Sequence, residues 1–246
     1  MNLNPILSQA SEWMGVFAVA MLEGTSARFA RRPLVFRYAT RELTFSFSLF
    51  ALILAVAILL YQFIRPPLFV EQDPTYTIGR LVLAVACLAP FVLALLLRGQ
   101  PARAIGWGGQ TLRPSLIMGV SLGLLALFLR GKAFTILNGI EAAQANALVY
   151  YLLIGLLEET IFRGYLQLRF VSSWGQWPGI LLTALLYSLW HLPRILAQPQ
   201  TGETAVLQVA MTFVHGIVLG YLMHRTGNVL APGIYHGISS WLGILP

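Results

Sequence analysis

Long apolar stretches separated by short arginine-bearing segments are the feature that most constrains how this chain can fold. Hydrophobic residues fill 57% of its 246 positions and charged residues only 10%, whereas soluble domains carry about 25% charged residues. A water-soluble fold of this length could not cover so much apolar surface with so few charges. We therefore expect lipid to be the solvent for much of the chain, and the protein to be a polytopic integral membrane protein.

Seven stretches are candidate membrane spans, because a transmembrane helix needs about 20 apolar residues. They are residues 43–64, 80–97, 112–129, 146–165, 178–191, 204–223 and 229–245. The fifth and seventh are short, so we expect them to be tilted or enclosed by neighbouring helices. The predicted fold is an all-α bundle of about seven transmembrane helices at 43–246, preceded by an amphipathic, interfacial helical segment at 1–42.

The basic residues predict how the bundle is oriented. Fifteen of the sixteen are arginines, mostly in short loops, as the positive-inside rule describes. The predicted inner set is Arg28, Arg31, Arg32, Arg37, Arg41, Arg98, Arg103, Arg113, Arg163, Arg169 and Arg225. The predicted outer set is Arg65, Arg80, Arg130, Lys132 and Arg194, with the acidic Glu71, Asp73, Glu141 and Glu203.

This distribution favours a cytoplasmic N-terminus and an external C-terminus in a bacterial cytoplasmic membrane. The five arginines between positions 28 and 41 are expected among anionic headgroups. The net charge of +7 does not favour nucleic acid as a partner, because no basic stripe with interleaved aromatic residues occurs.

Polar residues inside three predicted spans are candidates for a functional site, because a charge at the centre of a membrane helix costs about 2.5–3.5 kcal/mol on insertion scales. They are Glu158, Glu159 and Arg163 in the fourth span, Tyr187 and His191 in the fifth, and His236, Ser239 and Ser240 in the seventh. A residue that imposes such a cost is usually retained because it has a function.

Helical geometry separates the two glutamates. Glu159 and Arg163 lie four residues apart and can pair on one face. Glu158 points about 100° away, so it is left for another partner and could take a proton from water shared with a histidine. A structural clamp is the simpler interpretation of the Glu159–Arg163 pair, and a lone membrane histidine often bonds between helices. His215 is interpreted as such a packing residue.

The order and spacing of these groups resembles the CAAX prenyl protease and bacteriocin-processing family of glutamic intramembrane proteases, which includes the type II CAAX prenyl proteases. The resemblance covers about residues 147–240, the expected catalytic core. It rests on the motifs Glu158-Glu159-x-x-x-Arg163, Tyr187-x-x-x-His191 and His236, and on Gly216-x-x-x-Gly220-Tyr221 and Arg225-Thr226-Gly227 between the last two.

The resemblance implies a role for each matching residue. Glu158 would be the general base that activates water together with His191, and Glu159 and Arg163 would support that site. His236 would stabilise the oxyanion. Ser240 stands where the family usually has Asn, with Ser239 as its neighbour, and Tyr187 replaces the commoner Phe.

The implied activity is an endopeptidase without a cofactor, acting on peptides or protein tails at the lipid bilayer. We expect its cavity to open towards the cytoplasmic half, since the fourth span runs inward. Prenylated tails are one substrate class, and peptide maturation, bacteriocin immunity or membrane-protein processing fits a bacterial chain better.

The same residues bear on other classes of function. An aspartyl protease needs two aspartates, and Asp73 is the only one. A rhomboid-like serine protease would need a histidine after Ser239 or Ser240, and none follows. Three alternatives stay open: a metal-dependent protease that uses Glu158, His191 and His236, a non-proteolytic scaffold or immunity protein of the same fold, and a transporter. Transport is the least favoured, since no paired Gly- or Pro-broken spans occur.

Overall fold

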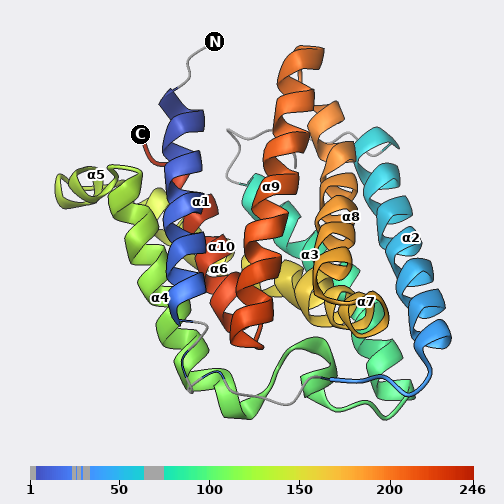
Figure 1. Ribbon diagram of the computed structural model, residues 1–246. Helices are drawn as coiled ribbons and strands as arrows, with labels where there is room; N and C mark the ends of the chain where they lie inside the picture. The colour runs from blue at the N-terminus through green and yellow to red at the C-terminus, as the bar shows by residue number, and fades with distance from the viewer. Residues whose placement is uncertain (1–3, 24–25, 27–28, 30–33, 64–74) are drawn as a thin grey trace.

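The computed structural model describes residues 4–23, 26, 29, 34–63 and 75–246, which form a bundle of helices (Figure 1). Its α-helices are α1 (Asn4–Glu23), α2 (Ala39–Phe63), α3 (Thr75–Leu97), α4 (Leu112–Leu129), α5 (Ala133–Leu137), α6 (Ala142–Glu159), α7 (Leu168–Trp174), α8 (Gln176–Ala197), α9 (Gly202–Thr226) and α10 (Leu230–Leu242). Two short 3₁₀ turns, η3 (Ala102–Ile105) and η4 (Gly109–Thr111), connect α3 to α4. No strand occurs in these residues, so the predicted all-α class is confirmed.

Six helical stretches in the described residues are long and apolar enough to cross a membrane. They are Ala39–Gln62, Ile78–Leu97, Gly109–Leu129, Ala142–Trp174, Gln176–Ala197 and Gly202–Thr226. They coincide with the first six predicted spans, and the protein is a helical membrane bundle. The fifth span is longer than expected, because α8 has 22 residues.

The seventh predicted span forms the short helix α10. Its 13 residues extend about 20 Å at 1.5 Å per residue, less than the roughly 30 Å of a hydrocarbon core. Most of its side chains are buried, and it packs against α4, α6 and α9. The prediction that neighbouring helices enclose this segment is therefore confirmed. The segment does not form a seventh full-length span.

The fourth span changes its helical type at the candidate site. After Glu159 the chain continues as a π-helix, η5 (Thr160–Gln167), before α7 resumes α-helical geometry. All eight residues of η5 are buried. A π-helical turn shifts the hydrogen bonds from i→i+4 to i→i+5 and is frequent at functional sites.

Glycines allow α6 and α10 to lie in close contact. A Cβ atom at Gly155 of α6 would lie 2.6 Å from the carbonyl oxygen of Gly233, and one at Gly237 of α10 would lie 2.7 Å from Cα of Leu152. Small residues at such crossings let membrane helices approach backbone to backbone. This contact brings the glutamates of α6 next to α10.

The two ends of the bundle differ in the number of arginines that they carry. The arginine-rich end is where α2 begins and α3 and α9 end, at the bottom of Figure 1. The opposite end is where α2 ends and α3 begins. Arg37, Arg41, Arg98, Arg103 and Arg225 lie at the arginine-rich end.

The N-terminal helix stands along the bundle against α4 and α9 (Figure 1). The fully buried Glu12 binds Arg130 and accepts a hydrogen bond from Tyr235, 2.7 Å away, and Met21 accepts one from Arg225. The helix therefore runs from the opposite end towards the arginine-rich end. The arginine distribution predicts that the N-terminus lies at the arginine-rich end, but α1 begins at the opposite end and packs lengthwise along α4 and α9.

Some predicted features fall outside the described residues. These are Arg28, Arg31, Arg32, Arg65, Glu71 and Asp73. The division at residue 42 and the interfacial character of the first segment stay predictions.

Candidate active site

Glu158 is the residue on which three helices converge. Its Oε2 atom accepts a hydrogen bond from the Tyr187 hydroxyl at 3.3 Å, and it lies 3.8 Å from Nε2 of His191 and 3.8 Å from Nε2 of His236. The side chain of Glu158 is only 2% exposed. Helices α6, α8 and α10 thus bring together the three groups of polar residues that the sequence singled out.

The ring of His191 is held in one orientation by its own helix. Its Nδ1 atom lies 3.0 Å from the carbonyl oxygen of Tyr187, one turn earlier on α8. A carbonyl oxygen can only accept, so Nδ1 carries the hydrogen of the neutral ring. Nε2 then has a free lone pair, and it faces Glu158.

The second glutamate ties three helices together. Oε2 of Glu159 lies 3.2 Å from Nε of Arg163, as the i,i+4 spacing predicted, and Oε1 accepts a hydrogen bond from Nδ1 of His236 at 3.0 Å. Arg163 also donates from Nη2 to the carbonyl oxygen of Gly216 on α9 at 3.1 Å. Glu159 and Arg163 are both fully buried. The pair therefore orients His236, whose Nε2 atom points to the Glu158 side.

The Tyr187 hydroxyl lies between Glu158 and His236. It is 3.3 Å from Oε2 of Glu158 and 3.3 Å from Nε2 of His236. The ring of Tyr187 packs edge-on against Phe162, and the guanidinium of Arg163 lies 4.5 Å from the ring centre. The phenylalanine that is commoner at this position could keep the packing but not the bridging hydroxyl.

A small pocket adjoins Glu158. It leaves about 10 Å³ for the centre of a water molecule, which is about the space that one water needs. The pocket is lined by Tyr61, Arg80, Leu83, Glu158, Trp190, His191 and Arg194. A single water held there would lie beside both the carboxylate and the imidazole.

Two arginines of this pocket were missed as site residues. Nη2 of Arg80 lies 3.7 Å from Oε1 of Glu158, and Arg194 lines the same pocket. Both were interpreted only as topology markers at the ends of spans. In the structure Arg80 lies inside α3, which begins at Thr75, and Arg194 lies one turn before the end of α8.

The position of the pocket differs from the predicted one. Tyr61 lies near the end of α2, Arg80 near the start of α3 and Arg194 near the end of α8. The pocket therefore lies towards the opposite end of the bundle, away from the arginine-rich end. The expectation of an opening on the arginine-rich side assumed that Arg163 faces that side, but Arg163 is buried between η5 and α9.

The two serines of α10 have different surroundings. Ser239 accepts hydrogen bonds from Arg130 at its hydroxyl (3.1 Å) and at its carbonyl (3.0 Å), so it belongs to the Glu12 network. Ser240 follows His236 by four residues and lies on the same side of α10. It is half-buried, and no side-chain hydrogen bond joins it to the described residues of the site.

His215 packs behind the site. Its Nδ1 atom accepts a hydrogen bond from the Trp13 indole at 3.0 Å, and its ring meets that of His236 edge-on at 5.4 Å. In the part of the chain that the structure describes, no group of three or more His, Cys, Asp or Glu side chains is arranged to hold a metal ion.

Comparison with known proteins finds a match over the segment that carries the site. Residues 141–242 match the model of a family described as type II CAAX prenyl endopeptidase Rce1-like. An uncharacterized 24.3 kDa protein of Escherichia coli is 28% identical over 145 residues, which cover 54% of this chain and 63% of the relative. No solved structure gives a significant match. The resemblance seen in the motifs is confirmed for this segment, since residues 141–242 are similar to a CAAX protease-like family.

Proposed function

We propose that this protein is an intramembrane endopeptidase in which Glu158 and His191 activate water for the hydrolysis of a peptide bond. The convergence of the Glu158 carboxylate, Nε2 of His191 and Nε2 of His236 beside a one-water pocket carries the proposal. A general base must reach its proton donor within hydrogen-bond distance or through one water, and this geometry suits the second route.

The reaction proceeds by addition and elimination. The water oxygen adds to the scissile carbonyl carbon while its proton passes to Glu158, and the carbonyl oxygen becomes an oxyanion. The C–N bond then breaks, and Glu158 returns the proton to the leaving amine nitrogen. His191 holds the water through its Nε2 lone pair.

The oxyanion needs donors that are already in place. His236 donates Nδ1–H to Glu159, so its protonated form offers Nε2–H to the oxyanion, and the Glu159 carboxylate balances the charge. The Tyr187 hydroxyl donates to Glu158 in the resting protein and lies 3.3 Å from Nε2 of His236, so it becomes a second donor to the oxyanion once Glu158 has taken the proton of the water. Removing one such donor costs about 2.7–4 kcal/mol in a protease where this was measured.

The substrate is proposed to be a peptide or protein tail at the membrane. The site lies within the bundle, so the scissile bond must enter from the lipid or from the end that carries Arg80 and Arg194. Maturation of a peptide or processing of a membrane protein fits this access.

We also propose that the arginine-rich end faces the cytoplasm of a bacterial cell. Two residues of the predicted inner set, Arg163 and Arg169, are buried, and Arg80 of the outer set lies in the pocket beside Glu158. Without these three, nine basic residues belong to the inner set and four to the outer set. This excess still favours the same orientation. Asn4 then lies at the external end, which replaces the cytoplasmic N-terminus expected from the sequence.

A cleavage assay tests the proposed activity. The purified chain in detergent is mixed with a quenched peptide library, beside Glu158→Ala and His191→Ala variants. We expect cleavage by the parent chain and none above background by either variant. Cleavage that persists in both variants would refute the assignment of the site.

Two alternatives have their own outcomes in this assay. A folded parent chain that cleaves nothing would favour the non-proteolytic scaffold, for which the serine at position 240 is the supporting observation. Loss of cleavage with a chelator, restored by a divalent metal, would favour a metal-dependent protease on Glu158, His191 and His236.

A further inference from the structure

A second and larger pocket lies at the arginine-rich end of the bundle, away from Glu158. It is formed between residues 34–42, which lead into α2, and residues 97–104, which follow α3. Its volume is about 430 Å³, within the range of pockets that hold small organic groups. Nothing in the proposed peptidase mechanism uses this pocket.

Basic side chains surround the pocket. Arg37, Arg41 and Arg103 line it, are exposed, and form no ion pair with the described residues. Arg98 lines it as a fourth guanidinium, and Glu42 is the only acidic residue among the described residues that line it. Four positive charges against one negative charge make the lining of the pocket electropositive, which favours an anion.

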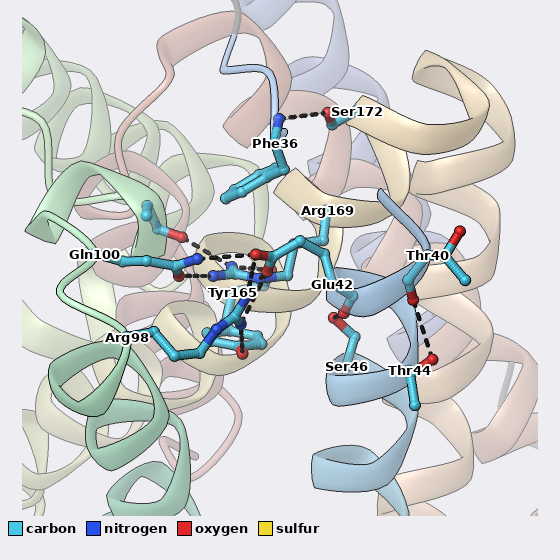
Figure 2. Close-up of polar contacts among 11 residues, drawn as sticks. Phe36, Thr40, Glu42, Thr44, Ser46, Arg98, Gln100, Tyr165, Arg169 and Ser172 are labelled. Carbon is cyan, nitrogen blue, oxygen red and sulfur yellow. Dashed lines mark hydrogen bonds and ion pairs between the residues drawn. The ribbon is translucent and has the colours of Figure 1, made fainter. Parts of the chain in front are cut away.

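The single acidic residue is already fully engaged (Figure 2). The Glu42 carboxylate pairs with Arg98 and accepts hydrogen bonds from Gln100 at 2.9 Å and from Nε of Arg169 at 2.8 Å. Arg169 is itself fixed by donating to the carbonyl oxygens of Ala104 and Tyr165, each at 2.9 Å. The buried side of the pocket is therefore rigid, and the charge of Glu42 does not cancel the exposed arginines.

The rim of the pocket is apolar. Val35 is 79% exposed and Leu97 is 78% exposed, and both line the pocket. Because α2 begins and α3 ends here, the pocket lies where the spanning helices leave the hydrocarbon, at the depth of lipid headgroups. Apolar side chains beside arginines match an acyl chain beside a charged headgroup.

We propose that this pocket binds the phosphate headgroup of an anionic phospholipid. The planar guanidinium of arginine suits phosphate oxygens because it can donate two parallel hydrogen bonds. Arg37, Arg41 and Arg103 hold the phosphate, and Val35 and Leu97 contact the first part of the acyl chains. The proposal does not depend on the peptidase activity.

Native mass spectrometry of the full chain in mild detergent, titrated with phosphatidylglycerol, tests the proposal. Losing one hydrogen bond between a guanidinium and the bound phosphate costs about 1 kcal/mol or more. We therefore expect Arg103→Gln to weaken binding of the lipid by about fivefold and Arg37→Gln/Arg103→Gln by roughly 30-fold. Phosphatidylcholine, whose net charge is zero, should bind the parent chain more weakly than phosphatidylglycerol.

The matched control is Arg113→Gln. Arg113 is exposed, and its substitution by Gln removes the same charge as Arg103→Gln. Arg113 does not line the pocket. Phosphatidylglycerol affinity should change less than about twofold in this variant, because a contact outside the pocket contributes little. An equal loss in Arg113→Gln and Arg103→Gln would overturn the proposal in favour of general surface charge.

A soluble competitor separates the two sources of phosphate. Glycerol phosphate at a concentration matched to the lipid should not displace phosphatidylglycerol, because it lacks the acyl chains that Val35 and Leu97 contact. Complete displacement would assign the pocket to a soluble phosphate and overturn the lipid. Equal binding of lipid by the parent chain and the double variant would refute any phosphate site.

Discussion

Two of the buried glutamates that lie near arginines, Glu42 and Glu158, differ in how many of their hydrogen bonds are made. Glu42, at the arginine-rich end, accepts hydrogen bonds from Arg98, Gln100 and Arg169. Glu158, towards the opposite end, accepts one hydrogen bond of 3.3 Å from Tyr187, and its arginine and histidine neighbours lie at 3.7–3.8 Å.

A carboxylate whose hydrogen-bonding capacity is filled serves a different purpose from one whose capacity is not. The donors near Glu42 all donate to its carboxylate, so Glu42 holds α2 together with α7 and with the segment that follows α3. The longer distances around Glu158 exceed those of normal hydrogen bonds, and the adjoining pocket has room for a water. Buried charge thus acts as a clamp where it is fully paired and as a candidate base where it is incompletely paired.

The largest expected effect comes from Glu158→Gln. This substitution keeps the shape of the side chain but removes the group that accepts the proton. We expect kcat for peptide cleavage to fall by about 10²–10⁴-fold, the usual contribution of a general base, with the melting temperature in detergent nearly unchanged. Wild-type kcat in this variant would place the base elsewhere and end the distinction between the two glutamates.

The same substitution at the other glutamate should act on stability instead. Glu42→Gln leaves Arg169, which is fully buried, without its carboxylate partner, and breaking a buried pair costs about 3–5 kcal/mol. We expect the free energy of unfolding to drop by that amount in a chemical denaturation experiment, while kcat per folded molecule is retained. Glu203→Gln, at an exposed helix start, is the control and should cost less than about 1 kcal/mol.

A smaller effect is expected for Tyr187→Phe. The ring keeps its packing against Phe162, but the hydroxyl between Glu158 and His236 is lost. A hydrogen bond to a charged group is worth about 1.5–3 kcal/mol, so kcat should fall about 10- to 100-fold with KM and stability little changed. An unchanged kcat would show that Tyr187 serves packing alone.

The three polar groups of the site could be predicted because each depends on a local property of the chain. Apolar runs identify the helices, and the spacing of Glu159 and Arg163 fixes their shared face. The close approach of α6 and α10 was not predicted, because it depends on Gly155 and Gly237 meeting across a tertiary contact. The π-helical turn after Glu159 likewise has no simple local signature.

The arginines were the main source of error. The positive-inside rule treats an arginine as a loop marker, but Arg169 is fully buried under Glu42 and Arg80 lies beside Glu158. Nothing in the sequence distinguishes these two from exposed loop arginines such as Arg103. Only their partners on other helices give them a role, and those partners are distant in sequence.

Ser240 gives the smallest expected effect. It lies on the same side of α10 as His236 but forms no side-chain hydrogen bond to the described residues of the site. A donor that is poorly aligned in the resting protein contributes about 1 kcal/mol, so Ser240→Ala should lower kcat by less than about tenfold. Ser240→Asn restores the side chain usual in the family and should match or exceed the parent kcat. A loss in Ser240→Asn as large as that in Glu158→Gln would mean that α10 is packed too tightly at this position for an amide, and that His236 and Tyr187 bear the oxyanion alone.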